Sequence, residues 1–223
     1  KYEYLIKKSN VVIASTPALA NKCNEIAGQD KSVFIPPTLD DERFVPRITS
    51  VKNERLTIGW TGTFSSKQYL DIVLPSLESL YRERDFKVKI IGNFEITNPA
   101  LDLEVVQWNE KEEINQLHDI DIGLYPLPED DWVSGKSGLK AMQYMAIGIP
   151  AVSTAVGNVL NIIEDEVDGI LVYEENEWKQ KLKILLDDEM KRNIIGKNAR
   201  KTFLSKYSRR KISRLYLQTL NMD

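Results

Sequence analysis

The sequence predicts an α/β fold, in which a parallel sheet is covered on both faces by helices. Three observations indicate this class. Short apolar segments alternate with longer segments of helical spacing over most of the 223 residues. The stretch 119–154 has the pattern of a strand, a glycine-containing loop, a helix and a second strand. The helix expected at about 137–147 is apolar nearly all round, which is typical of a buried helix.

Composition sets limits on the class of protein. With 42% hydrophobic residues the chain can form a real core, and its net charge of −3 gives no indication of a nucleic-acid partner. The single Cys23 excludes an internal disulfide and favours a reducing, cytoplasmic compartment. With one histidine, His118, the sequence argues against multi-histidine metal sites and a Ser–His triad. No apolar run has the length of a membrane span.

The first 53 residues resemble the end of one α/β domain followed by a linker. A strand is expected at 11–14, a helix from Thr16-Pro17 to Ala27 that Gly28 ends, and a strand at 32–35. Residues 40–53 are polar and lack periodicity, as in a linker. The N-terminus lacks a secretory apolar region and a Met, which we interpret as the start of a fragment.

A second domain is expected from residue 55. Its predicted strands lie at 56–60, 86–91, 101–108, 120–127, 149–153 and 169–172. Its predicted helices lie at 67–84, 110–117, 137–147, 159–163, 176–186, 189–206 and 208–220.

One face of the helix at 137–147 is polar. Lys136, Lys140 and Gln143 are spaced by four and three residues, so we expect them to share a stripe at the helix N-terminus, beside Gly135 and Gly138. Free backbone N–H groups and the positive end of the helix dipole lie there as well. This combination suits a phosphate or diphosphate. The alternative is that two lysines extend into solvent from a helix end.

A second loop follows the strand at 56–60. Gly62 would let the backbone approach a ligand, and the hydroxyls of Thr63 and Ser65 could donate hydrogen bonds to it. Alternatively, the segment is an ordinary turn with a serine at a helix start. Both loops follow carboxyl ends of strands, where doubly wound sheets bind ligands.

Other motifs give weaker indications. Gly135-Lys136-Ser137 resembles the end of a phosphate-binding loop, but Asp130 stands where that motif requires glycine, which excludes an ATPase. Asp119 and Asp121 have the spacing of a metal-binding pair, yet they begin a strand, so we expect structural roles for them and for His118. Glu129, Asp130 and Asp131 could accept hydrogen bonds from hydroxyls or be solvated, and Trp108 could stack on a flat ring or fill a core edge.

The C-terminal stretch is strongly basic. Between Met190 and Met222 there is no acidic residue, whereas the segment 164–189 is rich in acids. Contact with an anionic membrane surface is one interpretation. The interpretation we favour is a solvated helix face that complements the acidic segment.

Three segments together resemble a known family. They are IGWTGTFSSKQYL, DIGLYPLPEDDWVSGKSGLKAMQYMAIGIPAVSTAVGN and DGILVYEENEWKQKLKILLDDEMKRNIIGKNARKTFLSKYS. They are similar to the nucleotide-sugar-binding half of retaining glycosyltransferases of family 4, which have the GT-B fold. The N-terminal part of the chain resembles the last elements of that family's other domain, which binds the acceptor, and the linker between the two domains. The segments that carry this resemblance are VVIASTPALANKCNE and VFIPPTLDDERF. The resemblance covers nearly the whole chain.

The resemblance implies a domain plan and an activity. Residues 1–47 would be a remnant of the acceptor domain and linker, 54–206 a Rossmann-like donor-binding domain, and 207–223 a C-terminal crossover helix. The whole enzyme would transfer a sugar from a nucleoside diphosphate sugar to a saccharide or lipid-linked acceptor. It would retain the anomeric configuration, need no metal or cofactor, and serve cell-surface polysaccharide biosynthesis.

The resemblance also implies site residues. Lys136 and Lys140 would be catalytic, because they would stabilise the charge that develops on the leaving diphosphate. Gln143 would contact the ribose, Trp108 would border the base, and Gly135 would lie near the sugar. The remaining implied donor-binding residues are Gly62, Thr63, Ser65, Lys67, Asp130, Ser137, Gly138 and Leu139.

The chain departs from the family pattern. Gly135 and Gln143 stand where the family often has two glutamates, and Thr63 aligns with its loop arginine. The family's catalytic histidine would belong to the missing acceptor domain, so we expect this fragment to bind a nucleotide sugar but to turn it over poorly or not at all. A non-catalytic nucleotide-binding module is the alternative, and a GT-B epimerase or phosphorylase is a remoter one.

Overall fold

The computed structural model describes residues 1–47 and 55–220. Residues 48–54 and 221–223 are outside the described residues. They include the second half of the predicted linker, the predicted start of the donor-binding domain at residue 54, and the last residues of the predicted crossover helix.

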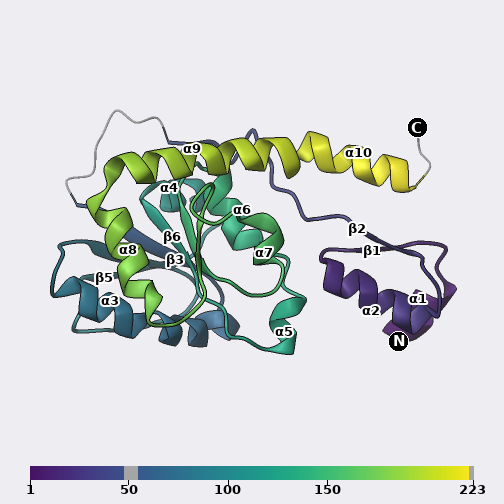
Figure 1. Cartoon of the computed structure of the whole chain (residues 1–223), viewed down its shortest axis with the longest axis horizontal. Helices are drawn as coiled ribbons and strands as arrows, with labels where there is room; N and C mark the ends of the chain where they lie inside the picture. The colour runs from purple at the N-terminus through teal and green to yellow at the C-terminus, as the bar shows by residue number, and fades with distance from the viewer. Residues whose placement is uncertain (48–54, 221–223) are drawn as a thin grey trace.

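A six-stranded parallel sheet organises the chain (Figure 1). Its order is β5-β4-β3-β6-β7-β8, and every neighbouring pair is parallel. The order reverses between β3 and β6, which makes this pair the switch point of a doubly wound sheet. The predicted fold class is therefore confirmed. The strands are β3 (Thr57–Thr61), β4 (Lys87–Ile91), β5 (Leu103–Val106), β6 (Ile122–Tyr125), β7 (Ala151–Thr154) and β8 (Ile170–Val172).

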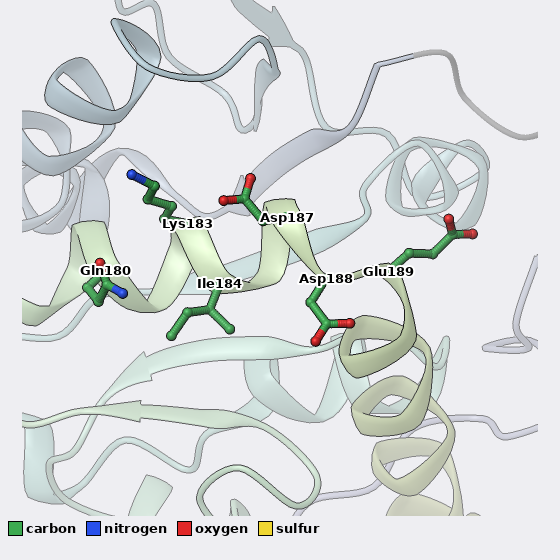
Figure 2. A pocket seen from close by; sticks show the side chains of 6 residues that line it. All are labelled: Gln180, Lys183, Ile184, Asp187, Asp188 and Glu189. Atoms are coloured by element: carbon green, nitrogen blue, oxygen red, sulfur yellow. The ribbon is translucent and has the colours of Figure 1, made fainter.

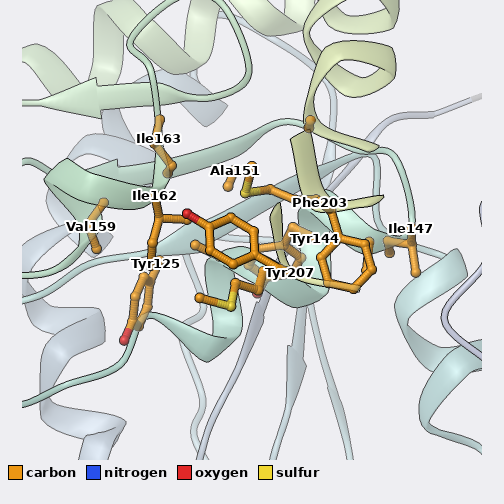
Figure 3. Packing of buried hydrophobic residues seen from close by; sticks show 14 of the residues in the cluster. Tyr125, Tyr144, Ile147, Ala151, Val159, Ile162, Ile163, Phe203 and Tyr207 are labelled. Carbon is orange, nitrogen blue, oxygen red and sulfur yellow. The ribbon is translucent and has the colours of Figure 1, made fainter. Parts of the chain in front are cut away.

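Helices cover both faces, and each face has its own core. On one face lie η1 (Phe64–Ile72), α3 (Leu74–Tyr81) and α8 (Glu177–Asp187), whose Leu70, Leu77 and Trp178 are buried on the sheet. On the other lie α4 (Glu113–His118), α6 (Leu139–Ala146), α7 (Val159–Ile162) and α9 (Glu189–Lys206). Figure 3 shows the centre of this second core, where Tyr144 and Phe203 lie among aliphatic side chains.

Tyr144 of α6 rests directly on the sheet. A Cβ atom added at Gly123 of β6 would lie 2.3 Å from the ring of Tyr144, so only glycine admits this close approach. The Tyr144 hydroxyl accepts a hydrogen bond from the Thr61 N–H at 3.2 Å and lies 3.3 Å from the carbonyl oxygen of Leu124. This buried hydroxyl thus bridges β3 and β6 at the switch point.

Several predicted elements differ from the observed ones. The helix expected at 67–84 is divided into the 3-10 helix η1 and the α-helix α3 at Val73, because Pro75 is accommodated only in the first turn of a new helix. The short helix α5 (Asp131–Ser134) lies within the segment expected to be a loop, and α1 (Tyr2–Lys8) was not expected. The helix α4 begins three residues later than predicted, because Asn109 stabilises a turn rather than the helix start.

The N-terminal segment forms a separate small layer. Strands β1 (Val12–Ala14) and β2 (Ser32–Phe34) pair in parallel, and α2 (Pro17–Ala27) connects them. Thr16 caps α2 through a hydrogen bond from the Leu19 N–H at 3.1 Å, as the Ser-Thr-Pro signal predicted. From α9, α10 (Arg209–Thr219) continues toward the side of the molecule where this segment lies (Figure 1).

The described part of the predicted linker is packed rather than loose. Phe44 is buried, and Arg200 of α9 donates hydrogen bonds to the backbone carbonyls of Phe44, Asp41 and Ala146. The His118 ring donates to the Val45 carbonyl at 2.8 Å, in agreement with the structural role that we expected.

Asp121 also has a structural role. Its carboxylate pairs with Arg47 of the linker and accepts a hydrogen bond from the Thr57 N–H at 2.9 Å. The carboxylate lies at the start of β6, at the edge of the sheet opposite the loops. These contacts agree with the structural role that we expected for Asp121.

Candidate functional site

The loops after β3 and β6 leave the sheet side by side. Trp60 and Leu124 are register partners in these two parallel strands, so both carboxyl ends face the same edge. In a doubly wound sheet the crevice outside this switch point is where ligands bind. The candidate site is therefore the region formed by residues 62–66, 126–138 and the first turns of α6.

Lys140 lies in the first turn of α6 and is partly buried. Its ammonium group lies 5.2 Å from the centre of the Trp60 ring and 5.8 Å from that of Tyr125, within the range of cation–π attraction. Burial and, to a smaller extent, the positive charge of nearby Lys136 together lower the pKa of Lys140 from 10.5 to about 8. The site thus holds two cations close together at an energetic cost that an anion would relieve.

Lys136 reaches the site from a turn and not from a helix. Its N–H donates to the Val133 carbonyl, and its ammonium group lies 5.1 Å from the centre of the Tyr69 ring. The predicted helical stripe is wrong in this respect, because α6 begins only at Leu139. Gly138 starts the helix with a φ of 82°, and a Cβ there would lie 2.1 Å from Ile162, so glycine is needed.

Gln143, one turn further along α6, belongs to a polar cluster that includes a residue not expected from the sequence. Its Nε2 donates to Oε1 of Glu113 at 3.1 Å, and the Trp108 Nε1 donates to the same oxygen at 3.3 Å. Arg43 of the linker pairs with Oε2 of Glu113 at 3.2 Å. In the sequence Glu113 was only one of several acids at a helix start, so nothing in the pattern distinguished it.

The loop after β3 is internally satisfied. Thr63 and Ser66 form a reciprocal capping box at the start of η1, and the hydroxyls of Thr63 and Ser65 lie 3.0 Å apart. A Cβ at Gly62 would lie 2.0 Å from the Trp60 ring, so packing alone already requires glycine at this position. The Lys67 ammonium donates to the Glu95 carbonyl at 2.6 Å, in the segment after β4.

The predicted residues on the sugar side have local roles as well. Asp130 caps α5 by accepting from the Val133 N–H at 2.8 Å, and the Ser137 carbonyl accepts from the Asn158 amide at 3.0 Å. Leu139 is 39% exposed. A Cβ at Gly135 would lie 3.6 Å from Leu19 of α2, so this loop lies next to the N-terminal segment.

A surface groove of about 450 Å³ lies elsewhere, where α8 meets α9 (Figure 2). Its charged side chains already have partners: Lys183 pairs with Glu83 at 2.7 Å and Asp187 with Arg84 at 2.6 Å. Asp188 caps α9 by accepting from the Lys191 N–H. The two ion pairs connect α8 to residues 83 and 84, which follow α3, and we assign the groove no role in donor binding.

Within residues 1–47 and 55–220, no three or more His, Cys, Asp or Glu side chains gather in a way that could hold a metal ion. Among the helices of the same residues, none combines the length and the apolar character needed to span a membrane.

Comparison with known proteins identifies the class. Residues 40–202 match the family described as Glycosyl transferases group 1. The chain belongs to this family, which confirms the predicted resemblance at the level of the family. The assignment to family 4 and the retaining course stay predictions.

Individual relatives are more distant. The chain is 23% identical to N-acetyl-alpha-D-glucosaminyl L-malate synthase of Bacillus anthracis over 238 aligned positions. This alignment covers 98% of the chain and 61% of the synthase. The structure of sucrose-phosphate synthase from Thermosynechococcus elongatus superposes with a TM-score of 0.77 at 15% identity, covering 100% of this chain and 61% of that one. The chain thus spans about three fifths of their length.

A third comparison involves a structure with bound UDP-glucose. HepE from Anabaena, solved in complex with UDP-glucose, superposes with a TM-score of 0.77 at 14% identity and covers 98% of this chain and 65% of that one. At such low identity these structures establish the fold alone. They confirm the predicted architecture of a glycosyltransferase with a Rossmann-like sheet over the full length of this chain.

Proposed function

We propose that the protein is a glycosyltransferase that transfers a sugar from a nucleoside diphosphate sugar to a saccharide or lipid-linked acceptor, and that this chain holds the donor. The observation that carries the proposal is the pair Lys136 and Lys140 beside the carboxyl ends of β3 and β6. Burial and the nearby charge of Lys136 make the charged form of Lys140 energetically unfavourable, as its pKa of about 8 indicates. A bound diphosphate would offset this cost.

The proposed chemistry is electrostatic. When the bond between the sugar and the diphosphate breaks, negative charge grows on the leaving phosphate. The two lysine ammonium groups and the N-terminus of α6 would stabilise this charge without a protein nucleophile. We further propose that the reaction is metal-independent and retains the anomeric configuration, as the family resemblance implies.

A non-catalytic nucleotide-binding module is the second candidate. Gly135 and Gln143 carry no carboxylate where the family often has glutamates. The absence of these two carboxylates favours binding over turnover. An epimerase or phosphorylase of the same architecture is a remoter candidate.

A peripheral membrane contact would involve α10. This helix carries Arg210, Lys211 and Arg214 together with Leu215 and Leu217, which are 39% and 46% exposed. A basic helix with exposed apolar side chains can lie on an anionic surface. Co-sedimentation with vesicles containing anionic lipids, compared with neutral vesicles, tests this part of the proposal.

Thermal unfolding with UDP, GDP and ADP tests donor binding in this chain. We expect one of the three to raise the melting temperature, and Lys140→Ala to abolish that rise. Lys197→Ala, which removes an exposed lysine on α9, should keep it. Absence of a rise with all three nucleotides would refute the donor site. Activity of the longer protein on labelled donor sugars then distinguishes an enzyme from a binding module.

A further inference from the structure

Glu113 lies at the centre of a cluster drawn from three parts of the chain. Its side chain is 14% exposed, although it belongs to a short surface helix. Arg43 comes from the linker, Trp108 from the segment after β5, and Gln143 from α6. All three direct donors at the two carboxylate oxygens, at distances of 3.1 to 3.3 Å.

This contact sets the orientation of the Gln143 amide. An ionised carboxylate can only accept hydrogen bonds, so the NH₂ end of Gln143 must face Glu113. The planar amide then directs its oxygen away from Glu113. The Nε2 end of the amide is thereby engaged by Glu113, and Oε1 is the end that can meet a ligand. Gln143 therefore offers one fixed acceptor.

The position of Gln143 relates this acceptor to the candidate diphosphate site. Lys140 and Gln143 are three residues apart on α6 and are neighbours on the helix surface. In a nucleoside diphosphate the ribose is the next group after the phosphates. A diphosphate held by Lys140 would thus bring ribose hydroxyls, which are donors as well as acceptors, close to Gln143.

We propose that Glu113 is a positioning residue that holds the Gln143 oxygen ready to accept a hydrogen bond from a ribose hydroxyl, and thereby selects ribonucleotide donors over deoxyribonucleotides. This inference rests on the proposed donor-binding function. The helix α6 has no acidic residue, so the carboxylate that acts on the ribose, through Gln143, comes from Glu113 of α4. The Arg43 and Trp108 contacts keep that carboxylate in place.

The test measures binding of UDP, ADP and GDP, and of their 2′-deoxy and 3′-deoxy forms, by calorimetry. We expect the unsubstituted chain to bind its ribonucleotide at least about fivefold more tightly than one of the deoxy forms, the ratio for a single net hydrogen bond. Glu113→Gln should reduce this ratio below about twofold, because a neutral amide at residue 113 can donate and lets Gln143 turn round. Glu110→Gln, the same change at an exposed position nearby, should leave the ratio intact.

A double substitution separates positioning from support of the fold. Gln143→Ala should abolish the preference, and adding Glu113→Gln should change it no further. An unchanged ratio in Glu113→Gln, or an equal loss for ribo and deoxy forms, would overturn the inference and leave the donor site standing. Absence of nucleotide binding by the unsubstituted chain would overturn both. If Glu113→Gln does not fold, Glu113→Asp, whose shorter side chain withdraws from Gln143, gives the same test.

Discussion

Replacing Lys140 with methionine should stabilise the fold while weakening donor binding. Burial and the charge of Lys136 lower the pKa of Lys140 from 10.5 to about 8. Between these pH values the unfolded chain therefore binds more protons than the folded chain. The free-energy cost of keeping Lys140 charged in the folded state is fully present below about pH 8 and disappears as the pH rises toward 10.5. Since each unit of pKa difference corresponds to about 1.4 kcal/mol, the charged Lys140 lowers the stability of the folded state by about 3 kcal/mol at neutral pH.

Part of that penalty is offset in the native protein. The ammonium group lies 5.2 Å from the Trp60 ring and 5.8 Å from the Tyr125 ring, and each such contact contributes about 0.5–1 kcal/mol. Methionine keeps the apolar stem of the side chain between these rings and removes the charge. We therefore expect a net gain of about 1–2 kcal/mol, which is a rise of about 3–6 °C in the melting temperature for a chain of this size.

Calorimetric or fluorescence-detected melting at pH 7, with nucleotide titration of the same samples, measures both effects. The gain should disappear when the melting is repeated near pH 10.5. A lower melting temperature for Lys140→Met at pH 7 would refute the argument that the buried charge is costly. Undiminished nucleotide affinity would refute the argument that the charge serves the diphosphate.

Three further predictions concern the same region and its support. Affinity for the bound nucleotide should fall about tenfold between pH 7 and 9 in calorimetric titrations, because Lys140 loses its proton near pH 8. Gly196→Ala should lower the free energy of unfolding, measured in urea, by about 1–3 kcal/mol, because the new Cβ would lie 2.2 Å from the Gly148 carbonyl oxygen. The control Asn193→Ala, at an exposed position of the same helix, should leave this free energy unchanged. Trp108→Phe should remove most of the fluorescence change that nucleotide binding causes, because Trp108 would border the base.

Each of these has a contrary outcome. Affinity independent of pH in this range would mean that Lys140 does not contact the diphosphate. Equal stability of Gly196→Ala and Asn193→Ala would mean that α6 and α9 are not packed as closely as the structure shows. A fluorescence change that persists without Trp108 would locate the base elsewhere.

The sheet was largely predictable because buried parallel strands are short apolar runs bounded by glycine and proline. Strands β3, β6 and β8 have this form, and the alternation with helices follows from it. The division of the helix at 67–84 was not predictable, because the apolar spacing continues through Val73 and proline is acceptable in a first turn. The four-residue α5 is too short for periodicity to reveal.

The candidate site was predicted in part. The proximity of Lys136 and Lys140 was expected, but a turn and not a helical stripe produces it, because Gly138 starts α6 after Lys136. Glu113 was missed because its contacts reach partners 30 residues ahead at Gln143 and 70 residues back at Arg43. Such contacts depend on the tertiary structure, so local sequence patterns do not predict them.

The hydroxyl of Tyr144 has a consequence for protein engineering. It accepts a hydrogen bond from the Thr61 amide at the end of β3, directly before Gly62, so it links α6 to the start of this loop. A transplant of either segment between homologous proteins should therefore move both, together with this tyrosine. A chimera that carries phenylalanine there would lose the hydrogen bond between this hydroxyl and the Thr61 amide, directly before the transplanted loop.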